Sequence, residues 1–186
     1  MNFKDAIFFF FFLFGLTCFA IAGDKNTSHK AKVAIPDVAL LALRFEENSS
    51  VDFVGTTTGA GDQINLKSKQ KPGVWLNYSS IGNGVQKRKI TATVAGIIPD
   101  GLTVTVKAEE SIGSGVGELG RSNGIVQLSE SPSDIISGIG SCYTGSGIQN
   151  GHLLSYNVEI DDDAFYENQN SEESVLSIVY TLTDDN

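Results

Sequence analysis

Short runs of β-favouring residues, separated by clusters of Gly, Asn, Asp and Ser, fill the chain from Ala31 to its end. No stretch shows a helical period of apolar residues sustained over three turns. This pattern is typical of an antiparallel β-sandwich or barrel, so we expect an all-β fold of roughly eight to ten strands. The clearest predicted strands are 74–81, 89–97, 102–108, 125–128, 153–160 and 174–183, and the weaker ones are 33–45, 51–54, 63–66 and 134–137.

Two of the clear runs flank the sequence Pro99-Asp100-Gly101. Proline presets φ for a turn, and glycine accepts the positive φ that turns require. Alternating runs on both sides of such a turn predict a β-hairpin, with residues 89–97 paired to residues 102–108.

The segment before the β-rich region has the features of a signal peptide. One lysine, Lys4, precedes the almost wholly apolar run Ala6–Phe14, and Ala20-Ile21-Ala22 fits the small-x-small rule for cleavage before Gly23. A retained membrane anchor and a lipid on Cys18 are the alternatives. Export with cleavage is the favoured interpretation, and it predicts a location in the periplasm, on the outer cell surface or in the medium.

Removal of 22 of the 186 residues leaves 164, which is enough for one domain with its own core. We expect a flexible leader over 23–30 and a single β-domain over 31–186, with no transmembrane segment in the mature chain. The formal net charge stays at −9, because the removed segment holds one lysine and one aspartate. Nucleic acids and anionic membranes favour a basic face, so we expect neither as a partner.

The run Gly115-Val116-Gly117-Glu118-Leu119-Gly120 matches the G-x-G-x-x-G pattern of dinucleotide-binding sites. That fingerprint requires a preceding strand, a following helix and a surrounding βαβ unit, and none of these is predicted here. We interpret Gly113–Gly124 as a long, flexible hairpin connection instead.

Residues for nucleophilic catalysis are scarce. Cys142 and His152 could form a thiol–imidazole pair, oriented by Asn150 or Asp161, but no local feature indicates a lowered thiol pKa. Cys142 is the one cysteine left after removal of the signal segment, so it has no partner for an internal disulfide. We predict a small buried residue there and no enzymatic activity.

An acidic cluster is the best metal candidate in the sequence. Its carboxylates are hard oxygen ligands that suit calcium, but the spacing of an EF-hand is absent. The favoured interpretation is a solvated turn at the end of a strand, and calcium is the weaker alternative. The five residues are Glu159, Asp161, Asp162, Asp163 and Glu167.

Exposed aromatic residues on an exported β-domain can stack on sugars. Trp75 and Tyr78 are separated by three positions, so they lie on opposite faces of one strand and do not form a flat platform. Tyr143 and Tyr166 lie in loop-like segments and are the remaining candidates for glycan binding.

Four segments together resemble a family of small exported proteins of Gram-negative bacteria, mostly uncharacterised. The similarity extends over most of the mature chain, from about Ile35 to Thr183. The segments are Ile35–Leu41 (IPDVALL), Val74–Ser80 (VWLNYSS), Gly138–Gly145 with Asn150–His152 (GIGSCYTG and NGH), and Val179–Thr183 (VYTLT).

The family in turn has a distant likeness to pilin subunits and to WxL-type surface domains. This resemblance implies an exported immunoglobulin- or pilin-like β-sandwich, and it supplies no catalytic residues. The sequence departs from both groups. WxL domains have one residue between Trp and Leu, whereas Trp75 is followed directly by Leu76, and Cys142 lacks the cysteine partner found in many pilins.

The sequence therefore favours a non-catalytic structural or adhesive surface domain, which could be a fibre subunit that associates with itself. In such a fibre Lys30–Leu43 is a candidate donor strand, although Pro36 lacks an N–H for a central ladder, and we favour a first strand of the chain's own sandwich. A module that binds glycan, calcium or a surface protein is the alternative, and an exported hydrolase is the most remote one.

Overall fold

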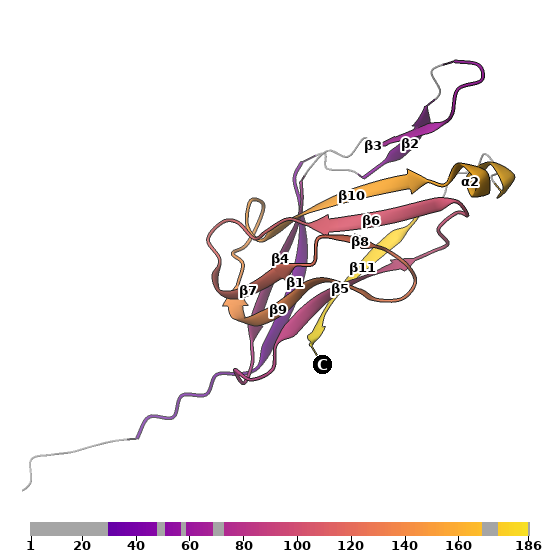
Figure 1. The fold of residues 1–186 in the computed structure, drawn as a ribbon. Helices are drawn as coiled ribbons and strands as arrows, with labels where there is room; N and C mark the ends of the chain where they lie inside the picture. Colours follow the sequence, from indigo (N-terminus) through magenta and orange to yellow (C-terminus); the bar gives the residue numbers. More distant parts are fainter. Residues whose placement is uncertain (1–29, 48–50, 57–58, 69–72, 169–174, 186) are drawn as a thin grey trace, which may run out of the picture. The chain divides into compact units, whose positions relative to one another are not determined.

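The computed structural model describes residues 30–47, 51–56, 59–68, 73–168 and 175–185 (Figure 1). The predicted signal peptide and nearly all of the predicted leader lie outside this part. The chain divides into two compact units, residues 1–34 and residues 35–186, and the fold described below is that of the second unit.

The described residues form an all-β fold with antiparallel pairing, as the sequence predicts. The clear predicted strands are present, with shifts of a few residues at their ends. The elements are β1 (Val38–Phe45), β2 (Phe53–Thr56), β3 (Asn65–Ser68), β4 (Val74–Ile81), β5 (Arg88–Ala95), β6 (Leu102–Ala108), β7 (Val116–Ser122), β8 (Ile125–Gln127), β9 (Ser133–Tyr143), β10 (His152–Ile160), α2 (Asp162–Asn168) and β11 (Ser177–Asp184).

Nine of these strands are joined in the order β11-β5-β9-β4-β10-β6-β8, with β1 added to β4 and β7 added to β9. Strand β4 connects the two halves of this arrangement. All eight of its residues pair with β1 on one edge. On the other edge its start, Val74–Leu76, pairs with β10, whereas Ser79 and Ser80 pair with β9.

The core lies between the two halves, which is the arrangement expected of a sandwich. Alternate residues of β5 in one half, and of β6 and β10 in the other, belong to one cluster of buried apolar side chains, together with several residues of β9. The fully buried members from these strands are Ile90, Ala92, Val106, Ala108, Ile135, Ile136, Ile139 and Leu154.

The hairpin predicted around Pro99-Asp100-Gly101 is wrong. The turn itself forms, because the Leu102 amide donates to the Pro99 carbonyl at 3.1 Å and Gly101 has a φ of 76°. However, β5 pairs with β9 and β11, while β6 pairs with β8 and β10. Residues 96–101 carry the chain from one half to the other, so both strands contribute apolar residues to the same core.

The interpretation of Gly113–Gly124 as a flexible connection is also wrong, because β7 lies within it and pairs with β9 from Tyr143 to Ile136. Glycine allows the two backbones to approach closely. A Cβ on Gly117, whose φ is 96°, would collide with the Ser141 carbonyl. The G-x-G-x-x-G pattern is therefore part of a tightly packed strand.

The acidic turn predicted after β10 is a short helix, α2. The Phe165 amide donates to the Asp161 carbonyl at 2.9 Å, and Asp162 and Asp163 in the first turn complement the helix dipole. The helix also contacts the β2–β3 hairpin: the Gln63 side chain donates to Asp162, and the Ile64 amide donates to the Tyr166 hydroxyl at 2.8 Å. These contacts hold the hairpin beside the end of β10.

Candidate functional site

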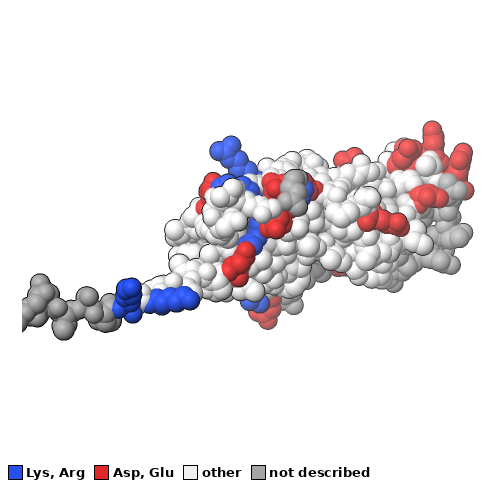
Figure 2. Space-filling model, turned by 90° about the horizontal axis from the view of Figure 1, so that it is seen from below, with Lys and Arg blue, Asp and Glu red and all other residues white. Residues whose placement is uncertain are grey.

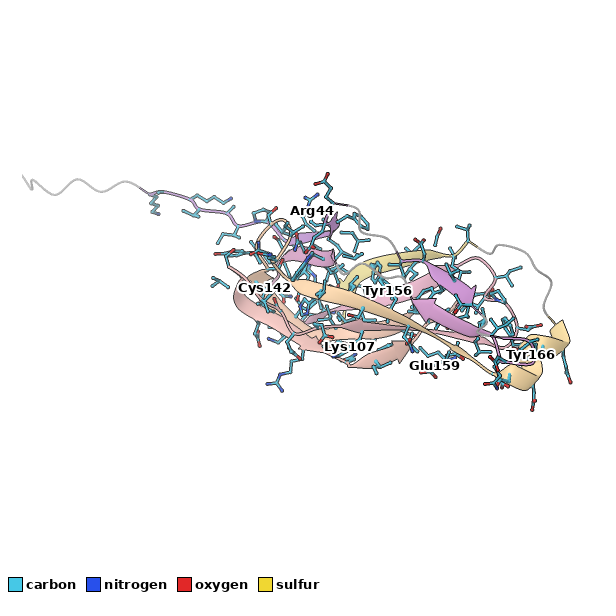
Figure 3. The ribbon with its side chains drawn as sticks, turned by 90° about the horizontal axis from the view of Figure 1, so that it is seen from above. Arg44, Lys107, Cys142, Tyr156, Glu159 and Tyr166 are labelled. Carbon is cyan, nitrogen blue, oxygen red and sulfur yellow. The ribbon has the colours of Figure 1, made fainter. Side chains whose placement is uncertain are left out.

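An apolar groove with a cavity volume of about 600 Å³ separates the β2 segment from the ends of β6, β10 and β11. Figure 3 shows Tyr156 in this region, between the body of the fold and the end that carries Tyr166. The lining residues are Val51, Asp52, Phe53, Val54, Gly55, Val104, Tyr156, Val158, Val175, Leu176 and Ile178.

The groove exists because the pairing of β10 is unequal on its two edges. On one edge β10 pairs with β6 from Leu154 to Ile160. On the other edge β4 covers only His152–Leu154, because β4 begins at Val74. The pairing of β10 with β4 thus ends at Leu154, whereas β10 continues beside β6 for six more residues, to Ile160.

Strand β11 forms the opposite wall. It pairs with β5 over its whole length, and the described chain provides no ladder on its other edge. The Tyr180 hydroxyl of β11 lies 2.5 Å from the Tyr156 hydroxyl of β10 and so links the two walls. Burial raises the pKa of both phenols, so both stay neutral and this part of the groove carries no charge.

The walls of the groove are core side chains that the fold leaves partly uncovered. Val104 and Tyr156 are buried, and Val158, Leu176 and Ile178 are half-buried against the same core. At the mouth, Val54 and Val175 are 38% and 81% exposed. The surface of the groove is thus largely apolar.

The residues before β1 form an exposed segment in which apolar and basic side chains alternate. Residues 30–37 are exposed and have no secondary structure. Ala31, Val33 and Ile35 alternate with Lys30, Lys32 and Ala34, so in an extended conformation one side is apolar and the other is basic. Val33 and Ile35 are 84% and 73% exposed. The prediction of a first strand within the chain's own fold is confirmed for Val38–Phe45, and the segment before Pro36 remains outside that strand.

The acidic candidates for calcium lie at the end of the fold that carries α2, where red side chains gather in Figure 2. Glu159 is near the end of β10, Asp161 follows that strand, and the other three are on α2. All five are exposed. In the part of the chain that the structure describes, no group of three or more His, Cys, Asp or Glu side chains is placed to hold a metal ion. Calcium binding here stays a prediction.

The two residues considered for catalysis, His152 and Cys142, are both buried in the fold. His152 is fully buried and stacks on Tyr78, with ring centroids 5.7 Å apart. Its Nδ1 lies 2.7 Å from the Glu109 carbonyl, which only accepts, so Nδ1 carries a proton. Its Nε2 lies 2.9 Å from the Tyr78 hydroxyl, which also donates to the Leu119 carbonyl. Both ring nitrogens are therefore engaged within the fold.

Burial lowers the pKa of His152 and raises the pKa of the buried Cys142 thiol to about 11. The imidazole is therefore neutral and the thiol protonated at neutral pH. Catalytic cysteines show the opposite shift. As predicted, Cys142 is a buried, free cysteine.

A polar network covers the outer face of β4 and connects two segments of the sequence resemblance. The Asn77 side chain accepts from the Gly147 amide at 2.9 Å and donates to the Asn150 carbonyl at 2.5 Å. The buried Thr144 hydroxyl accepts from the Tyr78 amide at 3.0 Å. These bonds hold residues 144–151 against the strand, which explains why the polar residues Asn77 and Thr144 are buried.

The aromatic pair considered for glycan binding is buried on both faces of β4. Tyr78 lies in the core, and Trp75 on the other face is 5% exposed and donates to Glu46 at 2.9 Å. Tyr143 and Tyr166 are exposed but belong to different elements, β9 and α2. Figure 3 shows Cys142, the neighbour of Tyr143 in the chain, on the far side of the folded unit from Tyr166, so the structure does not bring the two tyrosines together.

A second cavity, of about 450 Å³, lies near the start of β1 and is lined by charged side chains. Its charges are paired among themselves. Arg88 contacts Asp37 and, at 3.3 Å, Asp184, and Lys87 contacts Glu118. This cavity is therefore a poorer candidate for a binding site than the apolar groove.

Comparison of the chain with protein-family models, with curated proteins and with solved structures finds no match. Within the described residues, none of the helical structure has the length and apolar character needed to cross a bilayer. The groove and the exposed segment 30–36 are therefore interpreted from their geometry and chemistry.

Sequence reasoning did not identify the groove as a site. The alternation in 153–160 already indicates that Tyr156 and Val158 share the core-facing side of their strand. The missing information is how far β4 pairs alongside β10, because this depends on where β4 begins relative to β10.

Proposed function

We propose that this protein is a non-catalytic structural or adhesive β-domain that is exported and associates with other copies through its N-terminal segment, in the manner of a fibre subunit. One observation carries the proposal: Lys30–Pro36 is exposed, lacks secondary structure and alternates apolar with basic side chains, while the chain's own first strand starts at Val38. An extended segment of this kind can complete the sheet of a neighbouring molecule.

Pro36 lies between the exposed segment Lys30–Ile35 and strand β1. Proline lacks the N–H that a ladder needs, so it separates the strand that pairs with β4 from the residues before it. The residues most suited to catalysis, Cys142 and His152, are engaged in the core, which agrees with a structural role. The signal-peptide pattern of residues 1–22 supports export.

The proposal is tested by the mass of the processed, exported chain in solution, measured by light scattering after size exclusion over a range of concentrations. The wild-type chain should form oligomers that grow with concentration. The double variant V33D/I35D should raise the concentration needed for assembly by ~tenfold or more, because two apolar side chains lose their burial in the neighbour.

The matched control is V85D, since Val85 is 87% exposed in a loop outside the segment and the groove. It carries the same chemical change and should assemble like the wild type. A wild-type chain that stays monomeric at all concentrations, or a V33D/I35D chain that assembles as well as the wild type, would overturn the proposed function.

A further inference from the structure

We infer that Asn83 is a site of covalent self-modification, where the side-chain amide cyclises onto the backbone nitrogen of Gly84 and is then hydrolysed to aspartate or isoaspartate. Glycine places no side chain on the residue that attacks, so any Asn-Gly pair in a chain is a candidate for this reaction. The reaction is independent of the proposed self-association. The chain has three such pairs, which are Asn83-Gly84, Asn123-Gly124 and Asn150-Gly151.

The reaction needs only water as a second reactant. The Gly84 nitrogen loses its proton and forms a bond to Cγ of Asn83, while the bond from Cγ to Nδ2 breaks and ammonia leaves. Water then opens the resulting succinimide ring at one of its two carbonyls, which gives aspartate, or at the other, which gives isoaspartate. An intramolecular attack of this kind is fast only where the fold holds the reacting atoms close together and leaves them free.

The side chain of Asn83 bends back over its own following peptide. Its Oδ1 accepts from the Val85 amide at 3.1 Å and from the Gln86 amide at 3.3 Å. Bonds to amides two and three positions ahead keep the carboxamide beside the intervening Gly84, which holds the attacking nitrogen. The same two N–H groups polarise the side-chain carbonyl and stabilise the negative charge that forms on Oδ1 during the attack, as an oxyanion hole does.

The attacking nitrogen and the leaving nitrogen of this pair are both free. Among the described residues, neither the Gly84 amide nor Nδ2 of Asn83 has a hydrogen-bond acceptor. Both residues are exposed, so water reaches them and ammonia can leave. Gly84 has a φ of 80° and open space where a Cβ would lie, so no neighbouring segment obstructs the ring.

The pair at Asn150 is held in the opposite state. Oδ1 of Asn150 accepts from the amide and the hydroxyl of Ser114, both at 3.0 Å, so the side chain reaches a different segment. Its Nδ2 donates to two backbone carbonyls of its own loop, at 3.1 Å and 3.2 Å. The Gly151 amide donates to the Ile112 carbonyl at 3.0 Å. Cyclisation would have to break these bonds first.

The pair at Asn123 is protected in a similar manner. Nδ2 of Asn123 donates to the Asp134 carbonyl and to the Ser137 hydroxyl, both at 3.0 Å, so the side chain is directed to β9. The Gly124 amide donates to the Ser122 hydroxyl at 3.1 Å. Of the three pairs, all of which the structure describes, the one in the loop between β4 and β5 therefore keeps both nitrogens free.

The modification would change the polar cavity near the start of β1, because Asn83 is one of its lining residues. The formal net charge of −9 becomes more negative by one unit. Lys87 and Arg88, which also line this cavity, then face one more acidic group. In the aspartate product the two amides that bind Oδ1 become donors to a carboxylate, which strengthens these bonds.

The experiment incubates the folded, processed chain at neutral and mildly alkaline pH and follows all three sites over time. Digestion at acidic pH, where cyclisation is slow, and peptide mapping by mass spectrometry give the extent of conversion. Asn83 should convert at least ~tenfold faster than Asn123 or Asn150, because the bonds that must break at those sites add to the barrier. In urea the three sites should convert at similar rates, since the fold no longer distinguishes them.

Two alanine variants test the attacking residue. Gly84→Ala adds a methyl group beside the attacking nitrogen and should slow the conversion of Asn83 by ~tenfold or more. Gly82→Ala is the matched control, because Gly82 also has open space where a Cβ would lie but precedes the asparagine, and it should leave the rate unchanged. Circular dichroism and thermal melting check that both variants fold.

Several outcomes would overturn the inference. One is an Asn83 that stays unchanged in the folded wild-type chain, and another is conversion of either other asparagine as fast as Asn83. A product that contains aspartate without isoaspartate would also overturn it, because direct hydrolysis by water does not pass through the ring. The same holds if Gly84→Ala converts as fast as the wild type.

Discussion

At the scale of single residues, this protein uses polar side chains inside its core to hold strands in place. His152 shows this best, because it is fully buried and both of its ring nitrogens have partners on other segments, Glu109 and Tyr78. A buried imidazole with a carbonyl acceptor on one nitrogen and a hydroxyl on the other is most stable in the neutral form.

This state predicts a dependence of stability on pH. Since burial lowers the pKa of His152 in the folded state, the unfolded chain binds the proton more readily. The free energy of unfolding should therefore decrease as the pH falls below about 6.5, by at most about 1.4 kcal/mol per pH unit for one proton. Urea unfolding between pH 7.5 and 5 measures this slope.

The control for this experiment is His29→Gln, because His29 is the other histidine of the chain and lies outside the described residues. That variant should keep the slope of the wild type. The His152→Gln variant should be less stable at pH 7.5 and should show a smaller slope. A wild-type free energy of unfolding that is constant between pH 7 and 5 would contradict the neutral, buried state of His152.

At the scale of elements, the close approach of β7 to β9 depends on glycine. Gly117 has a φ of 96°, and a Cβ there would meet the backbone of Ser141 and Cys142. Gly124, just beyond β7, has a φ of 78° but has open space around a built Cβ. Both positions thus require a positive φ, but only at Gly117 would an added Cβ collide with neighbouring backbone atoms.

We expect Gly124→Ala to lower the free energy of unfolding by about 1–2 kcal/mol, from the left-handed conformation alone. Gly117→Ala should cost about 1 kcal/mol or more beyond that, since the backbone of β7 or β9 must also move. Parallel denaturant titrations of the two variants measure the difference. Equal losses would show that β7 is not packed on β9 as closely as described.

At the scale of the whole folded unit, one buried arginine joins β5 to β1, β4 and β11. Arg88 on β5 donates to the Val38 carbonyl of β1 at 2.6 Å and to the Ser80 hydroxyl of β4 at 3.1 Å. It also pairs with Asp37 and, at 3.3 Å, with Asp184 of β11. The guanidinium therefore holds the start of β1 against the rest of the fold.

Replacing Arg88 by Ala should lower the free energy of unfolding by about 2–3 kcal/mol, because several charge-assisted bonds are lost and the carbonyl of Val38 loses its donor. Arg88→Lys keeps the charge but not the planar fork, so its loss should be intermediate. Chemical denaturation of both variants tests the order. Arg88→Lys being as stable as the wild type would mean that charge alone, and not the fork, joins the strands.

The local pattern of side chains was sufficient to predict the all-β class, most strand positions and the buried state of Cys142. Alternation with a period of two is a property of neighbouring residues, so it can be recognised without knowledge of the partner strand. Turn residues such as Pro99 and Gly101 are local in the same sense, and the turn they predict is present.

Strand pairing is different, because it joins residues that are far apart in the chain. The turn at 99–101 connects the two halves of the fold instead of two paired strands, β7 forms where glycine suggested a flexible loop, and β10 continues beyond its pairing with β4 because β4 starts at Val74. Each of these depends on which backbone lies alongside which, and this is set by packing around a shared core. The groove beside β10 therefore became visible only once the strands were assembled.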